Sequence, residues 1–257
     1  MSRIENTFAR LKQQNRKALV GFLVSGDPDL ETSERNCRLA LDNGVDVLEL
    51  GVPFSDPTAD GPVIQASGQR SLAAGTTVSK VLAMARRLRQ DYQTPIVLFG
   101  YVNPYFSYGY EKLARDAAEA GVDAFLVVDL PFEESGELRL HLDKVGLEFI
   151  TLIAPTTPDD RLKILLQDAR GFVYYIMVKG VTGARAEMAV DVSDHLIRLR
   201  QHTNLPVAAG FGVSNGSQAR DAARHADGVV VGSALVKAAA AGRLADLVKE
   251  LRQALDA

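Results

Sequence analysis

Eight short apolar runs recur along the chain with helical patterns between them, and this alternation limits the fold more than any other feature. The runs are rich in β-branched and aromatic residues and do not alternate cleanly between apolar and polar positions. They lie at residues 19–26, 45–51, 95–101, 123–131, 148–155, 172–178, 206–212 and 227–234. Such runs are typical of parallel strands buried on both faces. Strands that alternate with helices predict an α/β protein with a parallel sheet.

The number of units favours a closed barrel over an open sheet. Residues 78–90, 111–121 and 245–255 have apolar residues three and four apart, which indicates amphipathic helices. Related junctions at 43–50, 120–127 and, more loosely, 225–232 indicate quasi-repeats of one βα unit. A doubly wound sheet would also alternate, but eight units in 257 residues fit a (β/α)8 TIM barrel better. No linker is visible, so we expect residues 1–257 to form a single domain.

The N-terminal segment predicts one element beyond the barrel. Ile4, Phe8 and Leu11 follow helical spacing within residues 2–15, and Ser2 can cap such a helix. This segment lacks the apolar stretch of a signal peptide, and no apolar run approaches the roughly 20 residues of a membrane helix. We therefore expect a cytoplasmic protein that carries an extra N-terminal helix.

Charge and cysteine content exclude several function classes. The formal net charge of −3 leaves no basic surplus for nucleic acid or an anionic membrane. A single cysteine, Cys37, rules out an internal disulfide and a multi-cysteine metal site. The four histidines show no metal-ligand spacing, so we expect no metal.

An acid interrupts the second apolar run. Because alternate residues of a strand share a face, Val45, Val47 and Glu49 should point one way and Leu48 and Leu50 the other. If the first set faces the barrel interior, Glu49 lies at the carboxyl end, where barrel enzymes build their active sites. Burial would raise the pKa of its carboxyl toward neutrality, as a general acid/base requires. The alternative is an acid merely exposed at a strand end.

A stiff loop follows the same strand. Pro53, Pro57 and Pro62 restrict the backbone of residues 52–62, which also contain Asp56 and Asp60. Either aspartate can be an ordinary turn former. Their position beside Glu49, in a loop that can hold a carboxylate in one place, favours a functional role.

The later strands suggest where a substrate would bind. Tyr174 and Tyr175 should point to opposite faces of the sixth strand, so one of them faces inward, for packing or for chemistry. Residues 179–193 have little periodicity and predict either a mobile lid or a plain surface loop. Gly210, Gly212, Gly232 and Ser233 end the last two strands, which is where barrels often bind phosphate. Pattern alone therefore predicts a small phosphorylated substrate, and the fallback interpretation is some phosphate-binding barrel lyase or isomerase.

Several motifs resemble the tryptophan synthase alpha subunit family. "FLVSGDP", "LELGVPFSDPTADGPVIQAS", "GYVNPYFSYG", "VVDLP", "GVTGAR", "AAGFGVS" and "GSALV" occur in order and cover essentially the whole chain. The resemblance implies a barrel lyase that cleaves indole-3-glycerol phosphate to indole and glyceraldehyde 3-phosphate. It also implies a heterotetramer with a beta subunit that carries pyridoxal phosphate, and no cofactor in this chain.

The resemblance implies roles for individual residues. Glu49 matches the general acid/base, Asp60 the carboxylate that holds the indole N–H, and Tyr174, six residues before Gly180, the active-site tyrosine. The positions around the indole match Phe22, Tyr101 and Phe211, and the lid positions match Thr182 and Gly183. The phosphate contacts match Gly183, Gly212, Gly232 and Ser233. The surface toward the beta subunit matches Asp56, Pro57, Asn103 and Pro104. Phe132, Met177 and Lys179 depart from the family's usual residues.

Two other functions stay open at this stage. One is a stand-alone lyase that releases indole without a beta subunit. The other is a barrel with little turnover that acts as an activating partner, although the intact Glu49 and Asp60 argue against it.

Overall fold

The computed structural model describes residues 1–176, 194–210 and 212–257. Within these residues, one parallel sheet follows the order β5-β4-β3-β2-β1-β9-β8-β7-β6. Its strands are β1 (Ala18–Val24), β2 (Val47–Gly51), β3 (Ile96–Gly100), β4 (Ala124–Val127), β5 (Glu148–Phe149), β6 (Thr151–Ile153), β7 (Val173–Ile176), β8 (Val207–Gly210) and β9 (Gly228–Val231).

The sheet closes on itself through one interrupted strand. The two ends of the order, β5 and β6, are separated in the chain by Ile150 alone. The Ile150 N–H donates to the Phe125 carbonyl of β4, whereas Thr151 already pairs with Val173 of β7. The predicted fifth strand is therefore split where its pairing passes from β4 to β7. The predicted (β/α)8 barrel is confirmed.

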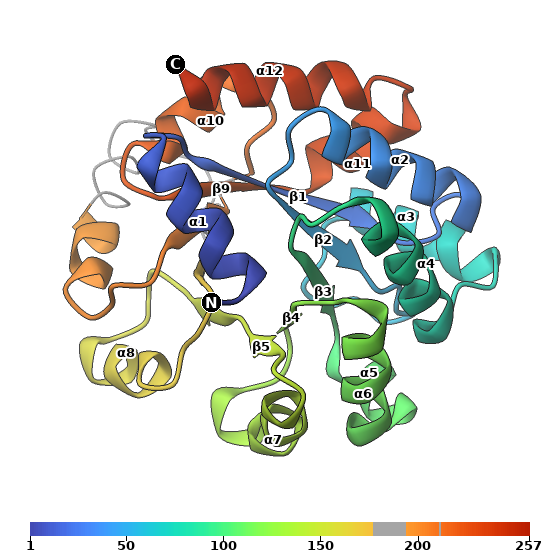
Figure 1. The fold of residues 1–257 in the computed structure, drawn as a ribbon, viewed down its shortest axis with the longest axis horizontal. Helices are drawn as coiled ribbons and strands as arrows, with labels where there is room; N and C mark the ends of the chain where they lie inside the picture. Colours follow the sequence, from blue (N-terminus) through green and yellow to red (C-terminus); the bar gives the residue numbers. More distant parts are fainter. Residues whose placement is uncertain (177–193, 211) are drawn as a thin grey trace.

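Helices surround the ring of strands (Figure 1). They are α1 (Arg3–Gln13), α2 (Leu30–Asp42), α3 (Pro62–Ala73), α4 (Val78–Asp91), α5 (Val102–Tyr108), α6 (Tyr110–Ala120), η1 (Phe132–Glu134), α7 (Gly136–Lys144), α8 (Asp159–Leu166), α10 (Gly216–Ala223), α11 (Ser233–Ala240) and α12 (Leu244–Asp256). Residues 194–200 are helical as well.

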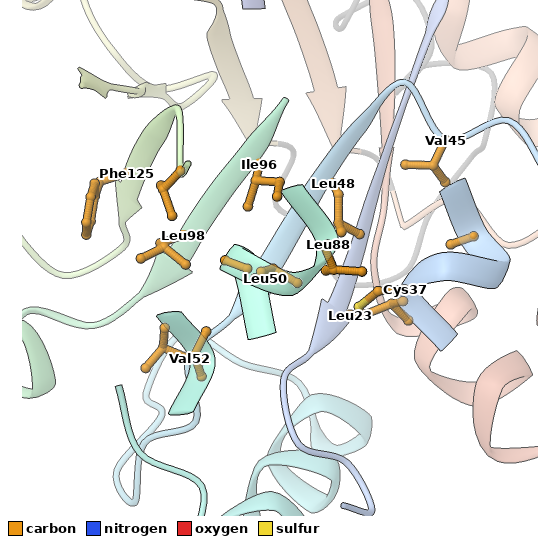
Figure 2. Close-up of a cluster of buried hydrophobic side chains, with 14 of the residues drawn as sticks. Leu23, Cys37, Val45, Leu48, Leu50, Val52, Leu88, Ile96, Leu98 and Phe125 are labelled. Carbon is orange, nitrogen blue, oxygen red and sulfur yellow. The ribbon is translucent and has the colours of Figure 1, made fainter. Parts of the chain in front are cut away.

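Alternation along the strands separates two cores. Leu48 and Leu50 of β2 pack outward against the helices, in the large cluster that Figure 2 shows with Leu88 of α4. Val47 faces the barrel interior. Val45 was expected on the same face as Val47, and this was wrong. It precedes β2 and belongs to the outer cluster, because the strand alternation begins only at Val47.

The extra N-terminal helix closes one end of the barrel. Ser2 caps α1 by accepting from the Glu5 N–H, and Glu5 accepts in turn from the Ser2 N–H. Phe8 of α1 packs 5.6 Å from the Phe172 ring, in the same interior cluster as Val47. In Figure 1 α1 lies across the ring of strands. The helix therefore covers the end where the strands begin and leaves their carboxyl ends for a site.

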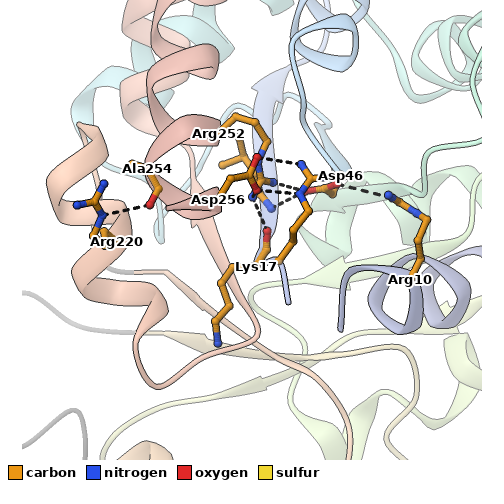
Figure 3. Close-up of polar contacts among 9 residues, drawn as sticks. Arg10, Lys17, Asp46, Arg220, Arg252, Ala254 and Asp256 are labelled. Atoms are coloured by element: carbon orange, nitrogen blue, oxygen red, sulfur yellow. Dashed lines mark hydrogen bonds and ion pairs between the residues drawn. The ribbon is translucent and has the colours of Figure 1, made fainter. Parts of the chain in front are cut away.

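The repeated junctions share one structural device. Asp46 accepts from the Leu19 N–H at 3.0 Å, and Asp123 and Asp227 accept in the same way from the first residues of β3 and β8, at 2.8 Å each. Each aspartate also pairs with an arginine. Figure 3 shows the pair of Asp46 and Arg252, 2.6 Å apart. These aspartates tie neighbouring strands together at the amino-terminal end of the barrel.

Candidate active site

Glu49 lies on the inner face of β2, near its carboxyl end. In the sheet register it stands between Phe22 of β1 and Val97 of β3. Its side chain is fully buried, and neither carboxyl oxygen has a hydrogen-bond partner within the described residues. Burial raises the pKa of this carboxyl from 4.5 to about 8, because removal from water disfavours the ionised form. Glu49 is therefore a buried acid near the carboxyl end of β2, and its catalytic role stays a prediction.

The two tyrosines of β7 point to opposite faces. Tyr174 packs against the interior cluster, whereas Tyr175 belongs to an outer cluster with residues of α8. Burial raises the pKa of the Tyr174 hydroxyl, and the nearby Glu49 carboxyl raises it further. Tyr174 is thus the inward tyrosine, within electrostatic reach of Glu49.

A pocket opens at the carboxyl ends of β1, β2 and β3. Phe22, Asp60 and Tyr101, three of the predicted site residues, line it together. The Phe22 and Phe99 rings meet edge to face at 5.0 Å, and the Phe54 ring lies 5.4 Å from Tyr101. Aromatic walls with one carboxylate can hold a flat, largely apolar ring that carries a polar N–H.

Asp60 is partly buried at the edge of this pocket. Burial raises the pKa of its carboxyl, and a hydrogen bond from the Tyr101 hydroxyl partly offsets the rise. The same hydroxyl accepts from the Ala59 N–H at 3.0 Å. Tyr101, at the end of β3, thus fixes both the backbone and the carboxylate of the Asp60 turn.

The glycines predicted to bind phosphate follow two paired strands, β8 and β9. Gly210 and Val230 are register partners on β8 and β9, and Gly212 and Gly232 each follow two residues later. Gly232 precedes α11, whose first residue is Ser233. A β-carbon on Gly232 would lie 3.6 Å from the Phe22 ring, so this helix start adjoins the aromatic pocket. Free N–H groups at a helix start suit an anion.

The four residues expected to face a partner lie on the same end of the barrel. Asp56 and Asn103 are exposed, and Pro57 and Pro104 are partly exposed. Pro57 also lines the aromatic pocket. The loop that carries Asp60 and the surface expected to face a partner are therefore adjacent.

Some predicted residues lie outside the described residues. These are Thr182, Gly183 and Phe211, together with the expected lid at 179–193 and the departures Met177 and Lys179. The third departure, Phe132, is described. The Arg139 guanidinium covers its ring at 5.0 Å, away from the pocket.

A larger hollow opens at the other end of the barrel. Lys12 and Arg16 line it, together with Arg200 and Asp227. It lies beside α1, at the starts of the strands. Since Glu49 and Asp60 are at the opposite end, the aromatic pocket is the candidate active site despite its smaller size.

The sequence reasoning missed several pocket residues. Phe54, Ile64, Gly68 and Phe99 line the pocket beside the predicted residues. Three of them have apolar side chains and Gly68 has none, so no pattern in the sequence separates this pocket wall from ordinary core. Gln65 contacts the Asp60 backbone and was also missed, although it lies within a motif that was recognised.

Comparison with known proteins decides the family. A sequence model described as tryptophan synthase alpha chain matches residues 8–256. The chain belongs to the tryptophan synthase alpha chain family. The tryptophan synthase alpha chain of Geobacter sulfurreducens is 51% identical, over 99% of both chains.

Solved structures of tryptophan synthase chains agree. That of tryptophan synthase subunit alpha from Legionella pneumophila is 36% identical, with a TM-score of 0.92 over 100% of this chain and 99% of that one. A tryptophan synthase chain from M. tuberculosis is 32% identical, with a TM-score of 0.91 over 99% and 98%. The expected membership in the tryptophan synthase alpha family, with its lyase activity in tryptophan synthesis, is confirmed.

Membrane-spanning helices and metal-binding clusters are both missing from the described residues. In the part of the chain that the structure describes, no helix is both long and apolar enough to cross a membrane. Among the same residues, no group of three or more His, Cys, Asp or Glu side chains could hold a metal ion.

Proposed function

We propose that the pocket at the ends of β1, β2 and β3 cleaves indole-3-glycerol phosphate to indole and glyceraldehyde 3-phosphate. In this proposal residues 1–257 act as a single domain, the alpha subunit of a tryptophan synthase. The observation that carries the proposal is Glu49, a fully buried carboxyl whose pKa is about 8, beside an aromatic pocket that also contains Asp60.

Glu49 moves the proton. Because the pKa of its carboxyl is about 8, it is mostly protonated at neutral pH and can donate to C3 of the indole ring. The resulting indolenine draws the electrons of the bond between C3 and the glycerol carbon, and that bond breaks. Glu49, now ionised, takes the proton of the adjacent glycerol hydroxyl as it becomes the aldehyde. The carboxyl is then back in its starting form.

Asp60 stabilises the charge that develops on the ring nitrogen. Protonation at C3 makes the indole nitrogen positive, and a carboxylate that accepts its N–H favours this state over the neutral ring. Ionised Asp60 is needed here, and the hydrogen bond from Tyr101 favours that form. The two carboxyls therefore work in opposite protonation states.

The other residues bind and orient the substrate. Tyr174 lies inside the barrel near Glu49 and would pack beside the reacting carbon. Phe22 and Tyr101 hold the indole, with Phe211 as implied by the family. Gly212, Gly232 and Ser233 take the phosphate at the start of α11. Thr182 and Gly183 keep the binding roles that the resemblance implies.

The partner is the beta subunit, in an assembly of two alpha and two beta chains. Asp56, Pro57, Asn103 and Pro104 would form the contact surface on this chain. Pyridoxal phosphate belongs to the beta subunit in this proposal, and the alpha chain needs no cofactor. The M. tuberculosis tryptophan synthase was solved in an aminoacrylate-bound form. This supports the proposal that tryptophan synthase carries out a second reaction besides the cleavage proposed for this chain.

The test is to mix the purified chain with indole-3-glycerol phosphate and follow indole. We expect slow release by the chain alone and faster release when a tryptophan synthase beta subunit is added. Equal rates with and without the beta subunit would favour a stand-alone lyase. Release in neither condition would refute the proposal.

A further inference from the structure

The backbone of the Asp60 turn is held by a side chain from the following helix. Gln65 of α3 donates from Nε2 to the Asp60 carbonyl at 2.9 Å and lies 3.5 Å from the Pro57 carbonyl. The Pro57 carbonyl also accepts from the Asp60 N–H at 3.2 Å. One carboxamide therefore bridges the first and last residues of the turn at 57–60.

The orientation of this amide is fixed by its partners. Both partners are backbone carbonyl oxygens, which only accept, so the NH2 group of Gln65 must face them. A carboxylate at position 65 would bring a third acceptor against the two carbonyls, and an apolar side chain would supply no donor. The contact thus depends on a donor at this length of side chain.

Tyr101 holds the same turn at a second point. Its hydroxyl accepts from the Ala59 N–H, the residue before Asp60. Gln65 comes from α3 and Tyr101 directly follows β3, so two separate elements hold this turn, at the peptide unit after Asp60 and at the unit between Thr58 and Ala59. A carboxylate on a backbone held in this way keeps its direction without a direct contact from Gln65.

The α3 helix is itself tied to the barrel. Asp27, just past β1, accepts from the Arg70 guanidinium at 2.7 Å and from the Ser67 hydroxyl. The Ser71 hydroxyl donates to the Ser25 carbonyl at 2.5 Å. Gln65 therefore extends from a helix that three side chains anchor to the loop after β1.

We propose that Gln65 is a positioning residue that aims the Asp60 carboxylate at the N–H of the substrate's indole ring. This inference rests on the proposed function, in which Asp60 accepts that N–H. In this inference Gln65 does not touch the substrate. It affects only the hydrogen bond that the ring N–H of the ligand donates to Asp60. Gln65 also connects Asp60 to Pro57 and hence to the surface expected to face the beta subunit.

A pair of ligands isolates that hydrogen bond. The first is 3-(indol-3-yl)propyl phosphate, and the second is its benzofuran counterpart, in which oxygen replaces the ring N–H. Calorimetric titration of the wild-type chain should show at least about tenfold tighter binding of the indole ligand, the ratio expected of one hydrogen bond to a charged group. A wild-type ratio near one overturns the Asp60 assignment and the inference with it.

The variant Gln65→Met then tests Gln65 itself, because methionine has similar length and no donor. We expect the ratio to fall to about threefold or less, with affinity for the benzofuran ligand within about twofold of wild type. Gln65→Glu should lower the ratio as well. The matched control is Gln69→Met, an exposed position one turn along α3, which should keep the wild-type ratio.

Two results overturn the inference while the proposed function stands. One is a wild-type ratio that persists in both Gln65 variants. The other is a parallel loss of affinity for both ligands, because a loss of that kind means that Gln65 supports the fold of the pocket rather than the aim of Asp60. Thermal unfolding of each variant, measured beforehand, sets a titration temperature at which all of them are folded.

Discussion

Phe22 and Glu49 are register partners on neighbouring strands, so an aromatic wall of the pocket and a buried acid stand side by side at the same level of the barrel. Phe22 also meets Phe99 and lies near Gly232. A flat ring against Phe22 would therefore have the Glu49 carboxyl on one side and the start of α11 on the other. This arrangement suits a substrate with an aromatic ring at one end and a phosphate at the other.

The buried Glu49 should make stability depend on pH. The pKa of its carboxyl is about 8 in the folded chain and about 4.5 when the chain unfolds. Between these values the folded state binds the extra proton, so the free energy of unfolding falls as pH rises. We expect the free energy of unfolding of wild type minus that of Glu49→Gln, both measured by urea unfolding, to decrease steadily from pH 5 to pH 8. Parallel curves for the two proteins would contradict the raised pKa.

Tyr101→Phe should shift the acid limb of activity. The substitution removes the acceptor of the Ala59 N–H and the hydrogen bond that lowers the pKa of Asp60. We expect kcat/KM at neutral pH to fall about fivefold, as for one lost hydrogen bond, and the acid limb to move to higher pH. Tyr92→Phe is the matched control, since the Tyr92 hydroxyl bonds Asp42 far from the pocket. If the acid limb of Tyr101→Phe stayed at the wild-type pH, the Tyr101 hydroxyl would not control the ionisation of Asp60 during catalysis.

Asp46→Ala should destabilise the fold without reaching the site. It leaves the buried Arg252 guanidinium without this carboxylate and the Leu19 N–H without its acceptor (Figure 3). Removing one partner of a buried ion pair costs about 3–5 kcal/mol, which urea unfolding would measure. Asp221→Ala, which breaks the exposed pair with Arg224, should cost below about 1 kcal/mol. Similar losses in the two variants would show that the junction aspartates are ordinary surface charges.

Much of this site could be predicted from the sequence, for physical reasons that apply to particular residues. Strand periodicity predicted that Glu49 and Val47 share one face of β2. Because barrel active sites lie at the carboxyl ends of the strands, the position of Glu49 near the end of β2 predicted a place in the site. The periodicity failed at Val45, because it does not say where a strand begins. It also gave no sign that pairing changes at Ile150.

Contacts to backbone atoms were the least predictable part. Gln65 acts on a carbonyl, and every residue type presents the same carbonyl, so the sequence carries no trace of that pairing. Phe99 was missed for a related reason. An apolar side chain in a strand predicts a core position, and the sequence does not distinguish it from the wall of a pocket.

The most direct test of the central claim is a single-turnover measurement of indole release by Glu49→Gln, with the chain in excess over indole-3-glycerol phosphate. Glutamine matches the size of the protonated carboxyl but cannot pass a proton to C3 and take one back. We predict a rate at least about 100-fold below wild type in a chain that still binds the substrate. A wild-type rate in this variant would contradict the role of Glu49 as the general acid/base.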